Sequence, residues 1–265
     1  MAATAQPGAP PREGMTWIAG GTFAMGSEDF YPEERPVRQV AVDGFWIDTA
    51  PVTVARFRRF VRATGWVTVA ERELDPAPGS LVFHPTAGPV PLDDFRQWWS
   101  YVEGACWHQP EGPGSDTYTR GKHPVVHVTP EDAEAYANWA GASLPTEAEW
   151  EFAAAGEYEL VNRWYGEFPW RGYRGTSPVG AFPPNARGLL DIVGNVWEWT
   201  ADPYELAHGG CCGGTATDEA PRRVIKGGSH LCAPTYCHRY RPAALQGEAI
   251  DTSTSHIGFR CIVRP

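Results

Sequence analysis

The sequence predicts an α+β fold in which little of the chain forms regular secondary structure. Its 265 residues include 29 glycines, 25 prolines and 12 tryptophans, and only 20% are charged, which is typical of a loop-rich globular protein. Three segments carry helix-capping signals, and two others carry strand-like patterns. We expect one domain over residues 15–265, preceded by a disordered leader over residues 1–14 that is rich in Ala, Pro and Gly.

Charge and hydropathy argue against two classes of partner. The formal net charge is −10, whereas nucleic-acid binding needs clustered Lys and Arg. No apolar run is long enough to cross a membrane, and residues 1–13 lack the apolar core of a signal peptide. We therefore expect a cytoplasmic protein that binds neither nucleic acid nor membrane.

Two amino-terminal segments are typical of strands. Residues 17–25 carry a Gly-Gly pair between apolar residues, which predicts a hairpin. Residues 37–47 alternate apolar and polar side chains like a single strand. We expect these segments to form a small sheet.

Three helices follow, each predicted from a capping threonine at its start and a glycine at its end. The segments are Thr53–Gly65, Thr129–Gly141 and Thr146–Gly156. The first has apolar residues at helical spacing, and the second has a first-turn proline followed by acidic residues. The third has a capping box ahead of an alanine run.

The remaining long segments, 75–122 and 171–223, are rich in Gly and Pro and show no periodicity. Loops of that length are uncommon in a compact domain unless they are functional or organised locally, for example by a bound ion. No internal repeat and no linker divides the chain, which agrees with a single domain.

Cys232 and Cys237 are the most specific chemical feature. Five positions apart in a turn-prone segment, they could direct both sulfurs at one soft ion, and Cu(I) accepts two thiolates. Structural zinc would need four donors and would have to recruit His230 and His238. The two cysteines could also form a disulfide or remain inert thiols. In a chain of this length without a visible secretion signal, free thiols or a metal site are favoured over disulfides.

The surroundings of these cysteines resemble the carboxyl-terminal signature of formylglycine-generating enzymes, also called sulfatase-modifying factors. The matching segments are KGGSHLCAPTYCHRYRPAA and DTSTSHIGFRC. Upstream, the likeness continues in order through WIAGGTFAMGSEDFYPEERPV, GFWIDTAPVT, ATGWVTVAE, HPVVHV, LPTEAEWEFAAAG and VGNVWEWTAD. This resemblance spans nearly the whole chain from Trp17 onward and implies the C-type-lectin-like fold of that family.

The resemblance also implies an oxidoreductase that uses O2 and Cu(I) to convert a peptidyl cysteine, in a sulfatase-type Cys-x-Pro-x-Arg segment, to formylglycine. Cys232 and Cys237 stand at the positions of the family's copper ligands. Ser229 stands where the family has a polar group beside the copper and oxygen site, and Tyr236 directly precedes the second ligand. Both are assigned catalytic roles, although a turn serine and a core tyrosine are equally good interpretations.

A structural calcium ion is implied by the segment 191–199. It has a carboxylate near each end with carbonyls between, which suits a hard cation that prefers oxygen ligands. The resemblance assigns the side chains of Asp191 and Glu198 and the carbonyl oxygens of Gly194 and Val196 to this ion.

A second family calcium site would use Asn162. An acidic ligand of that site is replaced here by Arg171, and a guanidinium cannot bind Ca²⁺. We therefore predict that the second site is lost.

The substrate groove implied by the resemblance involves Trp107, Ser255 and His256. Trp107 matches a groove tryptophan, although ordinary burial would also explain it. The groove departs from the family pattern at Leu245, Glu248, Ile250 and His256. These departures leave the physiological substrate open. The same chemistry could act on another peptide or a small-molecule thiol, or the fold could serve as a non-catalytic binding module.

The remaining cysteines receive no catalytic role. The partners that Cys261 would need for a family disulfide are missing, so we expect it to be a reduced, buried thiol. The family pattern does not explain the adjacent Cys211 and Cys212. We expect a flexible loop there, although metal delivery or redox sensing would also fit such a pair.

Overall fold

A computed structural model describes residues 8–73, 77–88, 90, 94–165, 168–169, 173–205, 221–234 and 237–265. The helices are α1 Val54–Thr64, α2 Pro130–Trp139 and α3 Glu147–Ala154, with 3-10 turns at Pro32–Glu34, Val69–Glu71 and Phe95–Gln97. The strands are β1 Met15–Ile18, β2 Gly21–Met25, β3 Arg38–Val42, β4 Phe45–Asp48, β5 Gly79–Phe83, β6 Trp99–Glu103, β7 Trp164–Tyr165, β8 Phe168–Pro169, β9 Trp197–Pro203, β10 Arg222–Lys226, β11 Leu245–Ala249, β12 Ile257–Gly258 and β13 Ile262–Val263.

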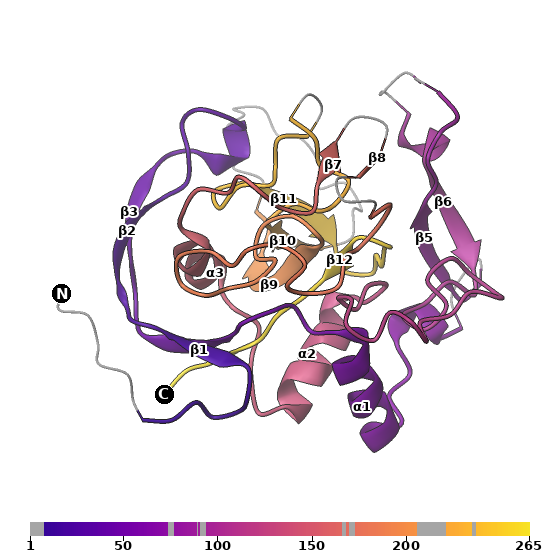
Figure 1. The fold of residues 1–265 in the computed structure, drawn as a ribbon, viewed down its shortest axis with the longest axis horizontal. Helices are drawn as coiled ribbons and strands as arrows, with labels where there is room; N and C mark the ends of the chain where they lie inside the picture. Colours follow the sequence, from indigo (N-terminus) through magenta and orange to yellow (C-terminus); the bar gives the residue numbers. More distant parts are fainter. Residues whose placement is uncertain are drawn as a thin grey trace.

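Short sheets dominate the architecture, as expected for an α+β fold with little regular structure. A four-stranded sheet of order β11-β10-β9-β12 lies at the centre, and a three-stranded sheet has the order β1-β4-β13. The β2–β3 ribbon curves around one side of this centre and the β5–β6 hairpin lies on the opposite side, while α1 and α2 lie next to each other below it (Figure 1).

All three predicted helices are confirmed, including their caps. The hydroxyl oxygen of Thr53 accepts a hydrogen bond from the backbone N–H of Arg56 at 3.3 Å, and Thr129 and Thr146 both form capping boxes. Each cap satisfies a helix N–H that has no partner within the helix. The capping signal is local, which is why the sequence alone could reveal it.

The predicted amino-terminal hairpin is wrong, because β1 and β2 do not pair with each other. Instead β1 pairs with β4 and β2 pairs with β3, so residues 15–25 run antiparallel to residues 38–48 as one bent ribbon. The Gly-Gly pair is the bend and not a turn. A Cβ at Gly20 would lie 2.5 Å from the carbonyl oxygen of Val42, so the ribbon can cross this point only with glycine.

Residues 37–47 are also two strands and not one. β3 ends at Val42 and β4 begins at Phe45, opposite the bend at Gly20. The alternation of apolar and polar residues over 37–47 therefore spans two strands. They are separate because β3 pairs with β2, whereas β4 pairs with β1 and β13.

The long segments without periodicity contain strands that sequence analysis missed. β5 and β6 lie within residues 75–122, and β9 lies within residues 171–223. In β9 the four consecutive residues from Trp197 to Thr200 are all buried, so the strand does not alternate between an apolar and a polar face. A central strand of this kind carries no period-two signal.

Part of the expected leader contacts the domain. Arg12 Nη2 lies 2.9 Å from Asp48 Oδ2, and the Gly14 carbonyl accepts a hydrogen bond from the backbone N–H of Thr49 at 2.8 Å. Residues within the range 8–14 therefore contact the domain, and residues 1–7 lie outside the described part of the chain. None of the described helices combines the length and apolar character required to span a bilayer.

Two hydrophobic clusters form the core. One joins α1, α2 and β9 and includes Cys232, whereas the other joins α3 and β4 with the segment around Ile192. Tyr240, which follows the second cysteine closely, packs against both clusters. The cysteine segment therefore lies over the junction between the two halves of the core.

Candidate active site and metal positions

The two cysteines singled out from the sequence are brought together. Cys232 Sγ and Cys237 Sγ are 3.4 Å apart. Cys232 is 2% exposed and belongs to the core, whereas Cys237 is only half-buried. One sulfur is thus anchored in the core, and the other is within reach of solvent.

Short-range turns build this segment. The backbone N–H of Cys232 donates to the Ser229 carbonyl and that of Cys237 donates to the Ala233 carbonyl, both at 3.0 Å. The preceding Gly228 has φ +69°, and a Cβ there would lie 2.7 Å from the Arg239 carbonyl oxygen. Only glycine allows this close approach of the two ends of the segment, which positions the sulfurs.

The pair is electrostatically asymmetric. The Cys232 thiol donates to the Cys237 sulfur, which lowers the pKa of Cys237 to about 7, and Arg239 and Arg241 lower it as well. The same hydrogen bond, together with burial, raises the pKa of Cys232. The pair therefore holds one proton readily and a second only weakly near neutral pH.

Sequence reasoning did not single out Arg239 and Arg241. Arg239 forms an ion pair with Glu33, and Arg241 forms one with Glu34. These acids come from the 3-10 turn Pro32–Glu34, far away in the sequence. The signal was the HRYR run after Cys237, but only the fold shows that these charges lower the pKa of Cys237.

Ser229 is fully buried beside the first cysteine. Its backbone N–H donates to Cys232 Sγ at 3.5 Å, and its Oγ accepts from the Leu231 N–H at 3.2 Å. The hydroxyl thus serves the turn, and its catalytic role stays a prediction. Tyr236, the other predicted catalytic residue, lies outside the described residues.

The zinc interpretation gains no support from the histidines. His230 Nδ1 is engaged with the Asn195 carbonyl at 2.8 Å, and the ring of His238 lies 5.0 Å from that of Phe30. Within the described ranges, neither histidine gathers with the thiols into a group of three metal-ligating side chains. A site with four donors is therefore not assembled there.

The segment predicted to bind calcium is hydrogen-bonded to the cysteine segment. The backbone N–H of Gly194 donates to the Gly227 carbonyl at 2.9 Å, and the backbone N–H of His230 donates to the Asn195 carbonyl at 2.9 Å. Val196, whose carbonyl is a predicted ligand, is buried in the same turn. Any ion held by this segment would support the loop that carries Cys232.

The two carboxylates of the segment predicted to bind calcium, Asp191 and Glu198, have different partners. Both Glu198 oxygens contact the guanidinium of Arg260, at 2.7 and 2.8 Å, and one also accepts from Trp150 Nε1 at 2.8 Å. Asp191 accepts from the Gly180 N–H and the Asn195 amide, but forms no ion pair within the described part of the chain. Burial raises the pKa of Asp191 to about 6.

Asn162 faces this turn. Its Nδ2 donates to Asn195 Oδ1 at 3.3 Å, and its own Oδ1 is buried without a hydrogen-bond partner. Arg171, on which the predicted loss of a second calcium site depends, lies outside the described residues. That loss stays a prediction.

Of the predicted groove residues, Ser255 and His256 both contact the β5–β6 hairpin, whereas Trp107 packs on α1. Trp107 is 5% exposed and packs edge-to-face on Phe57 at 5.4 Å, as ordinary burial requires. Ser255 Oγ accepts from the Phe83 N–H at 3.2 Å, and the His256 ring lies 4.7 Å from Trp99. Trp107 belongs to the same hydrophobic cluster as Cys232. The roles of all three residues in substrate binding stay predictions.

Three of the four altered groove positions lie in or next to β11, and the fourth, His256, directly precedes β12. Leu245 is buried and Ile250 is exposed, while burial raises the pKa of Glu248. Burial also lowers the pKa of His256 to about 3, which keeps its imidazole neutral. As expected, Cys261 is a free, buried thiol, and the adjacent Cys211 and Cys212 lie outside the described residues.

An open cavity of about 440 Å³ adjoins the cysteine segment. Its lining includes His238, Tyr240 and Arg241, which follow Cys237 in the sequence, together with Phe23 and Glu151 from other elements.

Comparisons with known proteins cover nearly the whole chain. Residues 2–265 match the model of the sulfatase-modifying factor enzyme 1-like domain. The chain is 50% identical over 289 aligned positions to the formylglycine-generating enzyme of Mycobacterium tuberculosis (strain ATCC 25618 / H37Rv), covering 94% of this chain and 97% of that protein. It is 39% identical over 276 positions to the inactive C-alpha-formylglycine-generating enzyme 2 of Bos taurus, covering 93% and 87%.

A solved structure agrees with the sequence comparisons. PvdO from Pseudomonas aeruginosa superposes with a TM-score of 0.64 at 25% identity, covering 94% of this chain and 93% of that one. This confirms the predicted C-type-lectin-like formylglycine-generating enzyme fold. The family match over residues 2–265 and the identity along nearly the full length show that the chain belongs to the formylglycine-generating enzyme, or sulfatase-modifying factor, family.

Proposed function

We propose that this chain oxidises a peptidyl cysteine in a sulfatase-type Cys-x-Pro-x-Arg segment to formylglycine, using O2 and Cu(I) held by Cys232 and Cys237. The observation that carries the proposal is the 3.4 Å separation of the two sulfurs, of which Cys237 is only half-buried. The 50% identity to a protein named formylglycine-generating enzyme supports the same activity.

The donor set fits a soft monovalent ion. Thiolates are the ligands that Cu(I) prefers, and two of them leave room for an incoming thiol. When bound, Cu(I) would supply an anchoring point for the substrate sulfur and electrons for the reduction of O2.

The protein's own groups prepare these ligands. The lowered pKa of Cys237 favours its thiolate near neutral pH, and Arg239 and Arg241 offset the negative charge. The Ser229 N–H donates to Cys232 Sγ and holds that sulfur in place. The substrate approaches from the side of Cys237, because Cys232 is sealed by the core.

The reaction balances with one added reductant. Conversion of the substrate's CH2SH group to an aldehyde consumes one water, releases sulfide and two protons, and removes two electrons. Reduction of O2 to two waters takes four electrons and four protons. Two external thiol groups supply the other two electrons and two protons and are themselves oxidised to a disulfide.

We further propose a structural Ca²⁺ at Asp191, Glu198 and the carbonyl oxygens of Gly194 and Val196. Asp191 supports it, since a buried carboxylate without an ion pair within the described residues gains from a cation. Because Arg260 already neutralises Glu198, Asp191 would make the larger electrostatic contribution.

A reducing, cytoplasmic compartment is proposed as well. The four cysteines in the described part of the chain are all free thiols. Such thiols are typical of proteins kept under reducing conditions.

The altered positions Leu245, Glu248, Ile250 and His256 favour one further candidate, in which the same chemistry acts on a different peptide or a small-molecule thiol. The assay that tests both supplies the purified protein with Cu(I), O2, a thiol reductant and a Cys-x-Pro-x-Arg peptide. Mass spectrometry should detect the aldehyde, and a peptide with serine in place of cysteine should remain unchanged.

The outcomes of this assay separate the possibilities. Copper binding without conversion of the peptide favours the different substrates. A protein that binds no Cu(I) contradicts the oxidase proposal and favours a non-catalytic module, as the name of the inactive relative suggests for that protein.

A further inference from the structure

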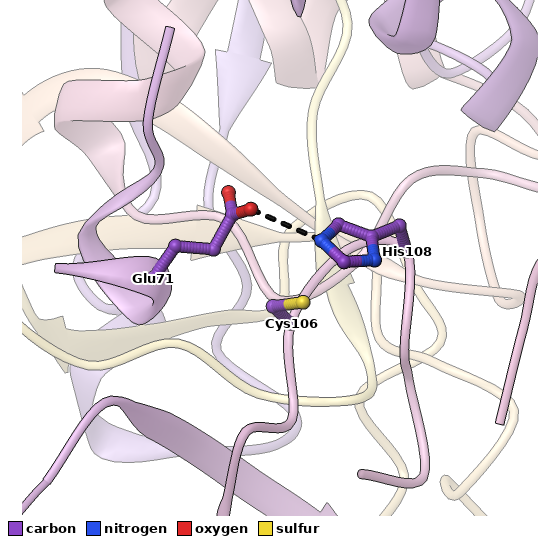
Figure 2. Close-up of side chains that lie close together, drawn as sticks. All are labelled: Glu71, Cys106 and His108. Carbon is purple, nitrogen blue, oxygen red and sulfur yellow. Dashed lines mark hydrogen bonds and ion pairs between the residues drawn. The ribbon is translucent and has the colours of Figure 1, made fainter. Parts of the chain in front are cut away.

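A second group of metal-ligating side chains contains neither of the two cysteines of the proposed active site. Glu71, Cys106 and His108 each offer one ligand atom, and these atoms lie within 4.8 Å of one another. Figure 2 shows the carboxylate and the imidazole facing each other, with the Cys106 sulfur below the gap between them. We propose that these three residues bind a divalent transition-metal ion, Zn²⁺, independently of the thiol pair.

The backbone holds two of the ligands in a tight turn. Cys106 and Gln109 exchange backbone hydrogen bonds in both directions at 3.1 Å, so Cys106 and His108 lie on a closed loop of four residues. Glu71 is the last residue of the 3-10 turn Val69–Glu71 and comes from a separate part of the chain. The ligands are therefore fixed by the fold before any ion binds.

Supporting residues orient the carboxylate. Glu71 Oε2 accepts hydrogen bonds from Thr68 Oγ1 at 2.6 Å, from the Thr68 N–H at 3.1 Å and from Trp107 Nε1 at 3.2 Å. This leaves Oε1, which lies 3.1 Å from His108 Nε2. Ligating carboxylates in metal sites are commonly held by such neighbouring donors, with one oxygen left for the ion.

The ligand types select the metal. One sulfur, one imidazole nitrogen and one carboxylate oxygen match the donors that zinc accepts, whereas Ca²⁺ and Mg²⁺ favour oxygen alone. On binding, the Cys106 thiol releases its proton to solvent, and the metal replaces the contact between Glu71 and His108.

The site is open on one side. Cys106 is 3% exposed, but the His108 side chain is 43% exposed and that of Glu71 is 25% exposed. Three protein ligands with a solvent-facing fourth position resemble zinc sites that bind water or an external ligand. An ion could therefore enter from the side of His108 without opening the core.

The test uses the full chain with the remaining candidate thiols removed by Cys211→Ser, Cys212→Ser, Cys232→Ser and Cys237→Ser. Titration of this metal-free parent with Zn²⁺ against a chromophoric chelator should show one bound ion. Adding His108→Asn should weaken binding by at least about tenfold. The matched control is His84→Asn, at an exposed histidine outside the cluster, which should leave the affinity unchanged.

A second readout reports the sulfur directly. Co²⁺ bound to the parent should show thiolate-to-metal charge-transfer absorption, and Cys106→Ser should abolish it. Circular dichroism checks that each variant is folded. Because His108 is half-exposed and Cys106 is buried, His108→Asn should disturb the fold less than Cys106→Ser. A parent that binds no Zn²⁺, or equal affinity in the parent and the folded His108→Asn variant, overturns the proposal.

Discussion

The cysteine segment and the segment beneath it that we propose to bind calcium differ in how completely their polar groups are paired. The sulfurs of Cys232 and Cys237 contact each other, and Cys237 is only half-buried. Glu198, by contrast, is fully buried and bound to Arg260 and Trp150. The difference indicates that the thiols remain available for a ligand, whereas Glu198 is held in place by its own partners.

The largest expected effect comes from changing the two cysteines of the proposed active site. Cys232→Ser and Cys237→Ser should each abolish tight Cu(I) binding and aldehyde formation, because a hydroxyl is a poor ligand for a soft ion. Chelator competition and mass spectrometry measure the two quantities. Cys261→Ala is the matched control, since it removes a buried thiol outside the pair and should retain activity. Near-normal copper affinity in either serine variant contradicts the site.

On the supporting side, Glu198→Gln should lower the free energy of unfolding by about 3 to 5 kcal/mol, because it leaves the Arg260 charge buried without its partner. Denaturant unfolding, with and without a calcium chelator, measures this loss. The exposed pair between Arg264 and Glu149 provides the control, and Arg264→Gln should cost less than about 1 kcal/mol. Equal losses in the two variants would remove the distinction between the two regions.

Acid should weaken the folded state through a buried histidine outside both regions. Burial lowers the pKa of His127 from 6.5 to about 4, so the unfolded chain binds a proton more readily between these values. Its contribution to stability is complete above pH 6.5 and falls as the pH decreases, by on the order of 3 kcal/mol in total. Unfolding of the wild type and of His127→Asn at pH 7 and pH 5 tests this, and the variant should lose less stability over that interval.

Calcium removal should have a smaller effect. With free Ca²⁺ at about a hundred times its dissociation constant, binding adds about 2.7 kcal/mol to the free energy of unfolding. Thermal unfolding with and without chelator should therefore show a shift that Asp191→Asn reduces. If the wild type shows no shift, the segment is held by Arg260 and hydrogen bonds alone.

The predicted site was only partly visible in the sequence. The spacing of Cys232 and Cys237 indicated a shared ion, and their sulfurs do lie together. By contrast, Arg260 pairs with Glu198 across a long sequence separation and was not anticipated. Glu71 meets Cys106 and His108 only after the fold brings a 3-10 turn against a distant loop.

The sequence by itself determined the short-range features: the threonine caps of α1, α2 and α3 and the turns that place the two cysteines. These depend on sterics and hydrogen bonds between neighbours, which the residues specify locally. Tertiary structure alone decided that residues 15–25 pair with residues 38–48 and that β9 lies at the centre of its sheet. The physical reason is that strand pairing is set by which apolar surfaces can be buried together, and this depends on the whole chain.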